Sequence, residues 1–145
     1  MKLFPKKNRV RKNFQVDSDL TLVQKTSQDV LAFLAPLSLG EGVFFDIRLC
    51  LEEALINAMK YGNGLKKEVP VELDVESDGK EVRITVKDQG PGFDPEKLAD
   101  CTDEKNLYRN RGRGVYLIYQ LMDEAKYNEK GNTLVMVKYL SKSKT

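Results

Sequence analysis

The chain has 145 residues with 41% hydrophobic and 32% charged side chains, which fits one globular domain with a sizeable core. Its net charge is only +2, so composition does not indicate a nucleic-acid partner, and no apolar run approaches the ~20 residues that cross a membrane. Histidine is absent, which excludes a histidine nucleophile, base, metal ligand or phospho-acceptor within this chain. Cys50 and Cys101 form no disulfide framework, so we expect a reduced, soluble, cytoplasmic protein.

The chain shows no internal repeat and no second domain, so residues 1–145 are expected to form one unit. The first twelve residues carry six basic and no acidic side chains. We expect residues 1–9 to form a flexible, solvated basic leader and residues 141–145 to form a flexible polar tail. Contact of the leader with an anionic partner is the alternative.

The N-terminal half predicts one strand and two helices. Alternating apolar side chains predict a strand at residues 10–17, and helical spacing from Leu20 predicts a helix that ends near residues 34–39. A second helix is expected at residues 42–61, ended by Gly62. Its apolar stripe is expected to contain Phe44, Ile47, Leu51, Ala54, Leu55 and Ala58.

The C-terminal half predicts a hairpin, a long polar segment, a helix and two further strands. The Asp78-Gly79 pair is typical of a hairpin turn, and Arg111-Gly112-Arg113-Gly114 is expected to open a third helix. Strands are expected at residues 69–76, 81–87, 123–128 and 133–140. This grouping favours an α+β fold, a two-layer sandwich with a mixed, mostly antiparallel sheet and helices on one face.

A first candidate site lies on the second predicted helix, where Glu52 and Glu53 interrupt an apolar stretch. Asn57 follows Glu53 by four residues, so the two side chains share a face that flanks the apolar stripe. A carboxylate beside a carboxamide suits a hard cation and a general base. The alternative is a helix edge with an incidental hydrogen bond. Lys60, one turn further, either faces a phosphate or is a solvated lysine.

A second candidate site lies at the end of the predicted strand 81–87. There Asp88-Gln89-Gly90-Pro91-Gly92-Phe93 places an acidic residue and two glycines at the edge of a sheet. Glycines allow close backbone approach or unusual backbone angles. The alternative is an ordinary turn between strands.

A third candidate site is Gly112-Arg113-Gly114, directly before a predicted helix. Backbone N–H groups at a helix N-terminus suit a phosphate, and Arg109 and Arg111 add positive charge nearby. The alternative is a flexible loop that ends in a helix start. Neither of the common phosphate-loop and dinucleotide glycine motifs is present.

Taken in order, these stretches resemble the GHKL (Bergerat) ATP-binding fold of gyrase, the large heat-shock chaperone, histidine kinases and MutL. The likeness is strongest to the small anti-sigma-factor serine/threonine kinases and covers about residues 10–140. The motifs that carry it are the N box with Glu53-Ala54-Leu55-Ile56-Asn57 through Asn63, the glycine boxes at residues 88–95 and 112–118, and a final turn at residues 128–133.

The resemblance implies a role for each matched residue. Asp88 would accept from the adenine amino group, Thr133 would assist through water, Asn57 would bind Mg²⁺ and Glu53 would be the catalytic base. Residues 93–111 would form a lid over the nucleotide. The implied nucleotide-binding residues are Asn57, Lys60, Asp88, Gly90, Gly92, Phe93, Arg111, Gly112, Arg113, Gly114, Val115 and Thr133.

The implied activity is transfer of the ATP γ-phosphoryl group to a serine or threonine of a small antagonist protein, the anti-anti-sigma partner. The domain would also sequester a sigma factor, with no direct nucleic-acid or membrane contact, and would form a homodimer through its N-terminal strand and first helix. A non-catalytic, ATP-gated binding module and a detached histidine-kinase catalytic domain are the alternatives. Tyr61 stands where the family commonly has histidine, which leaves any proton relay at that position in doubt.

Overall fold

The structure is a computed structural model that describes residues 9–92 and 109–140. Its sheet has five strands in the order β1-β2-β3-β5-β4. All four strand pairings in this described sheet are antiparallel, so the expected sheet is confirmed and no parallel pair occurs among these strands. The strands are β1 (Val10–Val16), β2 (Val71–Ser77), β3 (Glu81–Lys87), β4 (Glu124–Tyr127) and β5 (Thr133–Tyr139).

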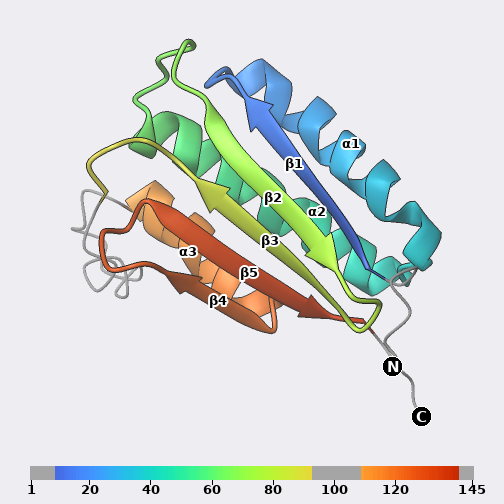
Figure 1. Cartoon of the computed structure of the whole chain (residues 1–145). Helices are drawn as coiled ribbons and strands as arrows, with labels where there is room; N and C mark the ends of the chain where they lie inside the picture. Colours follow the sequence, from blue (N-terminus) through green and yellow to red (C-terminus); the bar gives the residue numbers. More distant parts are fainter. Residues whose placement is uncertain (1–8, 93–108, 141–145) are drawn as a thin grey trace, which may run out of the picture.

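Three helices cover one face of the sheet, and α2 lies between the other two and contacts both (Figure 1). This is the two-layer α+β sandwich expected from the sequence. The helices are α1 (Val23–Leu34), α2 (Glu41–Asn57) and α3 (Arg109–Leu121), with short 3₁₀ turns η2 (Leu20–Leu22) and η3 (Ala35–Leu37) on either side of α1. Among the described helices, none has the length and apolar character that crossing a bilayer requires.

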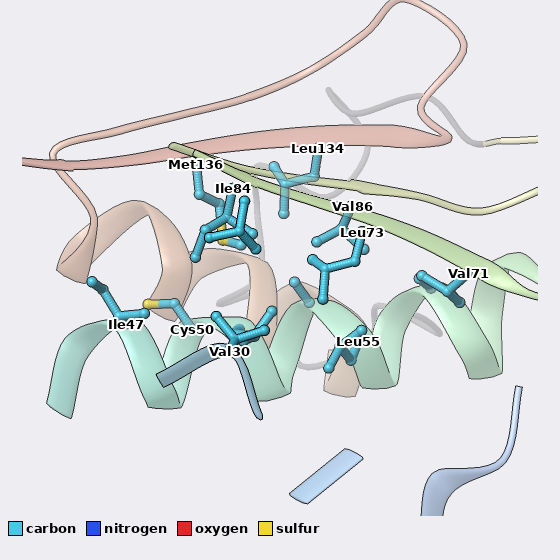
Figure 2. Packing of buried hydrophobic residues seen from close by; sticks show 14 of the residues in the cluster. Val30, Ile47, Cys50, Leu55, Val71, Leu73, Ile84, Val86, Leu134 and Met136 are labelled. Atoms are coloured by element: carbon cyan, nitrogen blue, oxygen red, sulfur yellow. The ribbon is translucent and has the colours of Figure 1, made fainter. Parts of the chain in front are cut away.

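The core lies between α2 and the inner face of the sheet. Ile47, Leu51 and Leu55 of α2 are fully buried, and Figure 2 shows sheet side chains such as Ile84 and Met136 directed toward this helix. Each such side chain contributes about 1.5–3 kcal/mol by leaving water. The packing fixes the position of α2 and therefore of any polar side chain that the helix carries.

The expected apolar stripe of α2 is wrong at one position. Phe44 keeps 43% of its surface exposed, and Phe45 beside it keeps 49%. Val43 is the residue of this turn that packs against the core, four positions before Ile47. Four-residue spacing places Val43 and Ile47 on one face, so Phe44 is left outside it.

The second helix also changes its winding where the sequence predicts it to run on to residue 61. From Ala58 to Gly62 the chain forms a π-helical turn, η4, and the Asn63 N–H donates to the Ala58 carbonyl at 2.8 Å. A π-turn accommodates one extra residue, which rotates the following side chains by about 100° relative to an unbroken α-helix. Helix α3 begins at Arg109, so the prediction that Gly112-Arg113-Gly114 directly precedes the helix is wrong, and this stretch lies within it.

Candidate functional site

The end of α2 and the π-helical turn η4 form the centre around which the three candidate stretches gather. Gly114 of α3 lies against Glu53 and Asn57, and Gly62 at the end of η4 lies against Asp88. Residues that are far apart in the sequence therefore line one continuous region. After the roles that the resemblance implies for them, we call the Glu53–Asn57–Gly114 part the phosphate side and the Gly62–Asp88 part the adenine side.

The phosphate side is built on the absence of a side chain at Gly114. A Cβ atom there would lie 2.6 Å from Glu53 Oε1 and 3.4 Å from Asn57 Nδ2. The first distance is too short for a real contact, so glycine at this position lets α3 approach the two polar side chains of α2. The acid and amide pair and the Gly-x-Gly stretch, predicted separately, thus belong to one site.

Asn57 is almost completely buried, with 4% of its surface exposed. Its Nδ2 has no hydrogen-bond partner among the residues that the structure describes. A buried polar group without a partner costs about 1–3 kcal/mol, and such groups concentrate where a ligand completes the bonding. Because Nδ2 is a donor, the carboxamide fits a site that holds a ligand with acceptor oxygens.

The structure separates the two neighbouring glutamates of α2. Glu52 accepts a hydrogen bond of 2.6 Å from the Ser27 hydroxyl, which ties α2 to α1. Glu53 points instead to α3 and forms no hydrogen bond or ion pair with the described part of the chain. Glu52 thus joins two helices, whereas Glu53 is the carboxylate that the described residues leave unbonded.

The adenine side is centred on Asp88, which is 5% exposed. Its N–H donates to the Asn132 carbonyl at 2.9 Å, and its Oδ1 accepts from the Gly90 N–H at 2.8 Å. A Cβ atom on Gly62 would lie 2.5 Å from Asp88 Oδ2, so glycine at 62 leaves room for the carboxylate. Asp88 is a buried acid held in a defined orientation.

Gly90 and Gly92 approach other parts of the chain. A Cβ atom on Gly90 would lie 2.7 Å from the carbonyl carbon of Gly62. Gly92 has φ of +82°, and its Cβ would lie 2.8 Å from the carbonyl carbon of Lys130 in the β4–β5 turn. Close packing within the protein is therefore sufficient to require both glycines.

Thr133 lies next to Asp88, as the sequence interpretation requires. It is the first residue of β5 and is paired with Lys87, which directly precedes Asp88. Asn128 Oδ1 accepts the N–H groups of Gly131, Asn132 and Thr133 and so shapes the β4–β5 turn.

For the remaining predicted residues that the structure describes, it gives exposure or position in a helix. Lys60 is exposed, with its Nζ 5.3 Å from the centroid of the Tyr61 ring, and Arg113 is also exposed. Gly112 and Val115 are buried in α3. Arg111 belongs to the first turn of α3, and Phe93, like most of the expected lid, lies outside the described residues.

A partly buried ion pair holds the far end of α3. Lys138 of β5 contacts Asp46 Oδ2 at 2.9 Å and donates to the Leu121 carbonyl at 2.6 Å, so it joins β5, α2 and α3. Burial, together with the charge of Asp46, raises the pKa of the Cys50 thiol to about 12. Cys50 is therefore protonated and inert at neutral pH, a packing residue.

Sequence reasoning missed two residues of this region, Gly62 and Asn63. Gly62 was treated as the end of a helix, and Asn63 only as the last residue of the N box, without a role of its own. Asn63 is 5% exposed, and its side chain accepts from the Gln89 N–H at 2.7 Å, directly beside Asp88. A glycine followed by asparagine where a helix ends is also an ordinary C-cap signal, so composition alone did not distinguish the two roles.

Comparisons with known proteins find relatives of this chain. Serine-protein kinase RsbW of Staphylococcus epidermidis is 34% identical over 105 residues, covering 67% of this chain and 66% of the relative. The Listeria monocytogenes protein of the same name is 31% identical and covers 66% of each chain. The chain thus spans just under two thirds of the length of these curated relatives.

The fold has a counterpart among solved structures. The crystal structure of the RsbU and RsbW domains of a Mycobacterium tuberculosis protein superposes with a TM-score of 0.66 at 16% identity, over 92% of this chain and 33% of that one. Residues 16–138 match the family model described as the histidine kinase-like ATPase domain. This chain therefore belongs to the histidine kinase-like ATPase family.

Proposed function

We propose that this domain is a serine/threonine protein kinase that uses ATP and Mg²⁺. Its substrate would be a small antagonist protein of the anti-anti-sigma type. The observation that carries the proposal is the contact of Glu53 and Asn57 with Gly114, together with the buried Asp88 against Gly62. The relatives named serine-protein kinases support the same reaction.

The adenine side supplies recognition of the base. A buried carboxylate accepts hydrogen bonds, so Asp88 would take the exocyclic amino group of adenine. Guanine carries a carbonyl oxygen at that ring position, and an acceptor facing an acceptor is unfavourable. Thr133, beside Asp88, would bind the same edge of the base through water.

The phosphate side supplies the groups for transfer. Phosphoryl transfer depends chiefly on positioning and on neutralising charge, and Mg²⁺ supplies that neutralisation when bound with the nucleotide. Among the described residues no group of three or more acidic, cysteine or histidine side chains could hold a metal alone. Asn57 with phosphate oxygens and waters fits the way Mg²⁺ is usually held.

Glu53 would serve as the base. Its carboxylate lies at the contact with Gly114 and is not engaged by the described part of the chain, so it is available to accept the proton of an attacking hydroxyl. An ATP-gated module without catalysis needs no such base, and the presence of Glu53 therefore favours the kinase. Exposed Arg113 and Lys60 add positive charge near the phosphates.

The proposed circuit is partner switching, in which the domain sequesters a sigma factor until an unphosphorylated antagonist competes for it. Homodimerisation through β1 and α1 is part of this proposal. The names of the relatives support the kinase activity. The sigma factor and the homodimer are expectations from the resemblance described in the sequence analysis.

The test is to incubate the full chain with γ-labelled ATP, Mg²⁺ and candidate antagonist proteins, and to map the label by mass spectrometry. We expect one phosphoserine or phosphothreonine on the partner. A partner with that residue changed to alanine, and a reaction with EDTA, are the controls. ATP binding without label on any partner would overturn the kinase assignment and leave the binding module.

A further inference from the structure

Asn63 uses its whole side chain in hydrogen bonds. Its Nδ2 lies 3.0 Å from Ser18 Oγ, 3.1 Å from the Val69 carbonyl and 3.2 Å from the Pro70 carbonyl. Its Oδ1 accepts from the Gln89 N–H at 2.7 Å. A single buried amide thus connects four separate points of the backbone and side chains.

The two ends of this amide do different things. The nitrogen end holds the chain between β1 and β2, where Ser18 also donates to the Val69 carbonyl at 2.6 Å. The oxygen end holds Gln89, the residue that follows Asp88. The oxygen end therefore bonds the backbone of the turn that carries the adenine-side acid, whereas the nitrogen end reaches that turn only through the Pro70 carbonyl, which also accepts from Gln89 Nε2 at 3.4 Å.

Gly62, the residue before Asn63, also contacts Asp88. Its backbone lies against the Asp88 carboxylate, and its carbonyl lies against Gly90. Residues 62 and 63 thus contact the turn at Asp88, Gln89 and Gly90 in succession. The π-turn at Ala58–Gly62 makes this possible, because one extra residue reorients Asn63 by about 100°.

We propose that Asn63 is the positioning residue that orients Asp88, and that the preference of the site for adenine depends on its Oδ1 atom. This inference rests on the proposed ATP site. The Gln89 N–H belongs to the peptide group that joins Asp88 to Gln89. If this N–H loses its hydrogen bond to Asn63 Oδ1, that peptide group can rotate, and the direction of the Asp88 carboxylate changes with it. A turned Asp88 carboxylate would bind adenine more weakly. Binding of the phosphates, at the other end of the site, would not change.

The test compares three variants of the full chain by calorimetric titration with ATP, GTP and inorganic tripolyphosphate, each with Mg²⁺. Asn63→Ala removes both ends of the amide, and we expect ATP affinity to fall about 10-fold or more. Tripolyphosphate affinity should stay within about 3-fold, so the ATP-to-GTP preference shrinks. In the kinase assay KM for ATP should rise while kcat at saturation stays within about 3-fold.

Asn63→Asp separates positioning from stability. It keeps an oxygen for the Gln89 N–H but places the other oxygen against the carbonyls of Val69 and Pro70, so the melting temperature should fall while the ATP-to-GTP preference stays near wild type. Ser18→Ala, the matched control at the nitrogen end, should behave in the same way. If Asn63→Ala does not fold, a lost ATP-to-GTP preference in Asn63→Asp would still contradict the proposal.

The outcomes separate the two proposals. A wild-type protein that does not prefer ATP to tripolyphosphate would contradict the ATP site itself. A wild-type protein that prefers ATP, with an Asn63→Ala variant that keeps the preference, would overturn the role of Asn63. Equal losses for all three ligands, or a lost preference in Asn63→Asp, would overturn it too, because each indicates general damage to the fold.

Discussion

The two sides of the site differ in how completely the protein satisfies its own polar groups. On the adenine side Asp88 and Asn63 are buried and their positions are fixed by hydrogen bonds to neighbouring backbone. On the phosphate side Asn57 Nδ2 has no partner within the described residues, and Glu53 forms no hydrogen bond or ion pair there. The described residues thus satisfy the polar groups at one end of the site and leave those at the other end unsatisfied.

This difference assigns separate tasks to the two sides. A hydrogen-bond acceptor that is already fixed in position loses little conformational entropy when a ligand binds. The adenine side is therefore expected to determine affinity and base preference. The unsatisfied groups of Glu53 and Asn57 are expected to interact with the reacting phosphates. The phosphate side is therefore expected to determine the rate of transfer. Substitutions on the two sides should therefore change different kinetic constants.

The largest effect is expected at Glu53. Glu53→Gln keeps the shape but removes the base, and the rate of phosphoryl transfer should fall about 10²–10⁴-fold with ATP affinity within about 3-fold. Rates with a labelled partner and calorimetric affinities measure the two quantities. Glu52→Gln is the matched control and should retain the rate, because Glu52 is bonded to Ser27 and not to the site. An unchanged rate in Glu53→Gln would remove its role as base.

Asp88→Asn tests the other side and should lower ATP affinity about 100-fold or more. An amide presents a donor where adenine also donates, and a lost charge-assisted hydrogen bond adds to the penalty. The fold should survive, because the remaining Oδ1 can still accept from Gly90. Circular dichroism with a thermal melt checks the fold, and near-normal affinity would contradict the assignment of the pocket.

Gly114→Ala should produce a smaller change in rate. The new Cβ would lie 2.6 Å from Glu53 Oε1, so the carboxylate must shift by several tenths of an ångström. Displacement of a catalytic group on this scale costs about 10–100-fold in transfer, with ATP affinity less affected. A larger loss of affinity than of rate would place Gly114 at the nucleotide and not at the base.

The smallest effect is expected at Ser27. Ser27→Ala removes the hydrogen bond to Glu52 and should lower the free energy of unfolding by about 1 kcal/mol, measured by urea denaturation. Kinase rate and nucleotide affinity should not change, because this bond joins α1 to α2 away from both sides of the site. A change in rate would mean that α1 helps to place Glu53.

Much of the fold was predictable, because alternation and helical spacing are local signals. The five strands lie within a few residues of their predicted bounds, and α2 was expected nearly in full. The stripe was wrong at Phe44, since Val43 takes the core position. The π-turn was not predictable, because one inserted residue at a helix end leaves no trace in the hydrophobic period.

The candidate site was predictable as a set of residues but not as a set of contacts. Glu53, Asn57 and Asp88 were identified from residue type and order. The approach of Gly62 to Asp88, and of Gly90 to Gly62, joins segments distant in sequence and depends on the fold itself. A glycine in a sequence can indicate close packing, but it does not identify the residue against which it packs.

The close approach of Gly92 to the Lys130 carbonyl has a consequence for the evolution of this family. No room remains between position 92 and the β4–β5 turn, so a side chain at position 92 requires a change in the turn. Relatives with a side chain at the position of Gly92 are expected to carry a β4–β5 turn of different length or course. The two positions should therefore vary together among homologues, although no ligand need touch either of them.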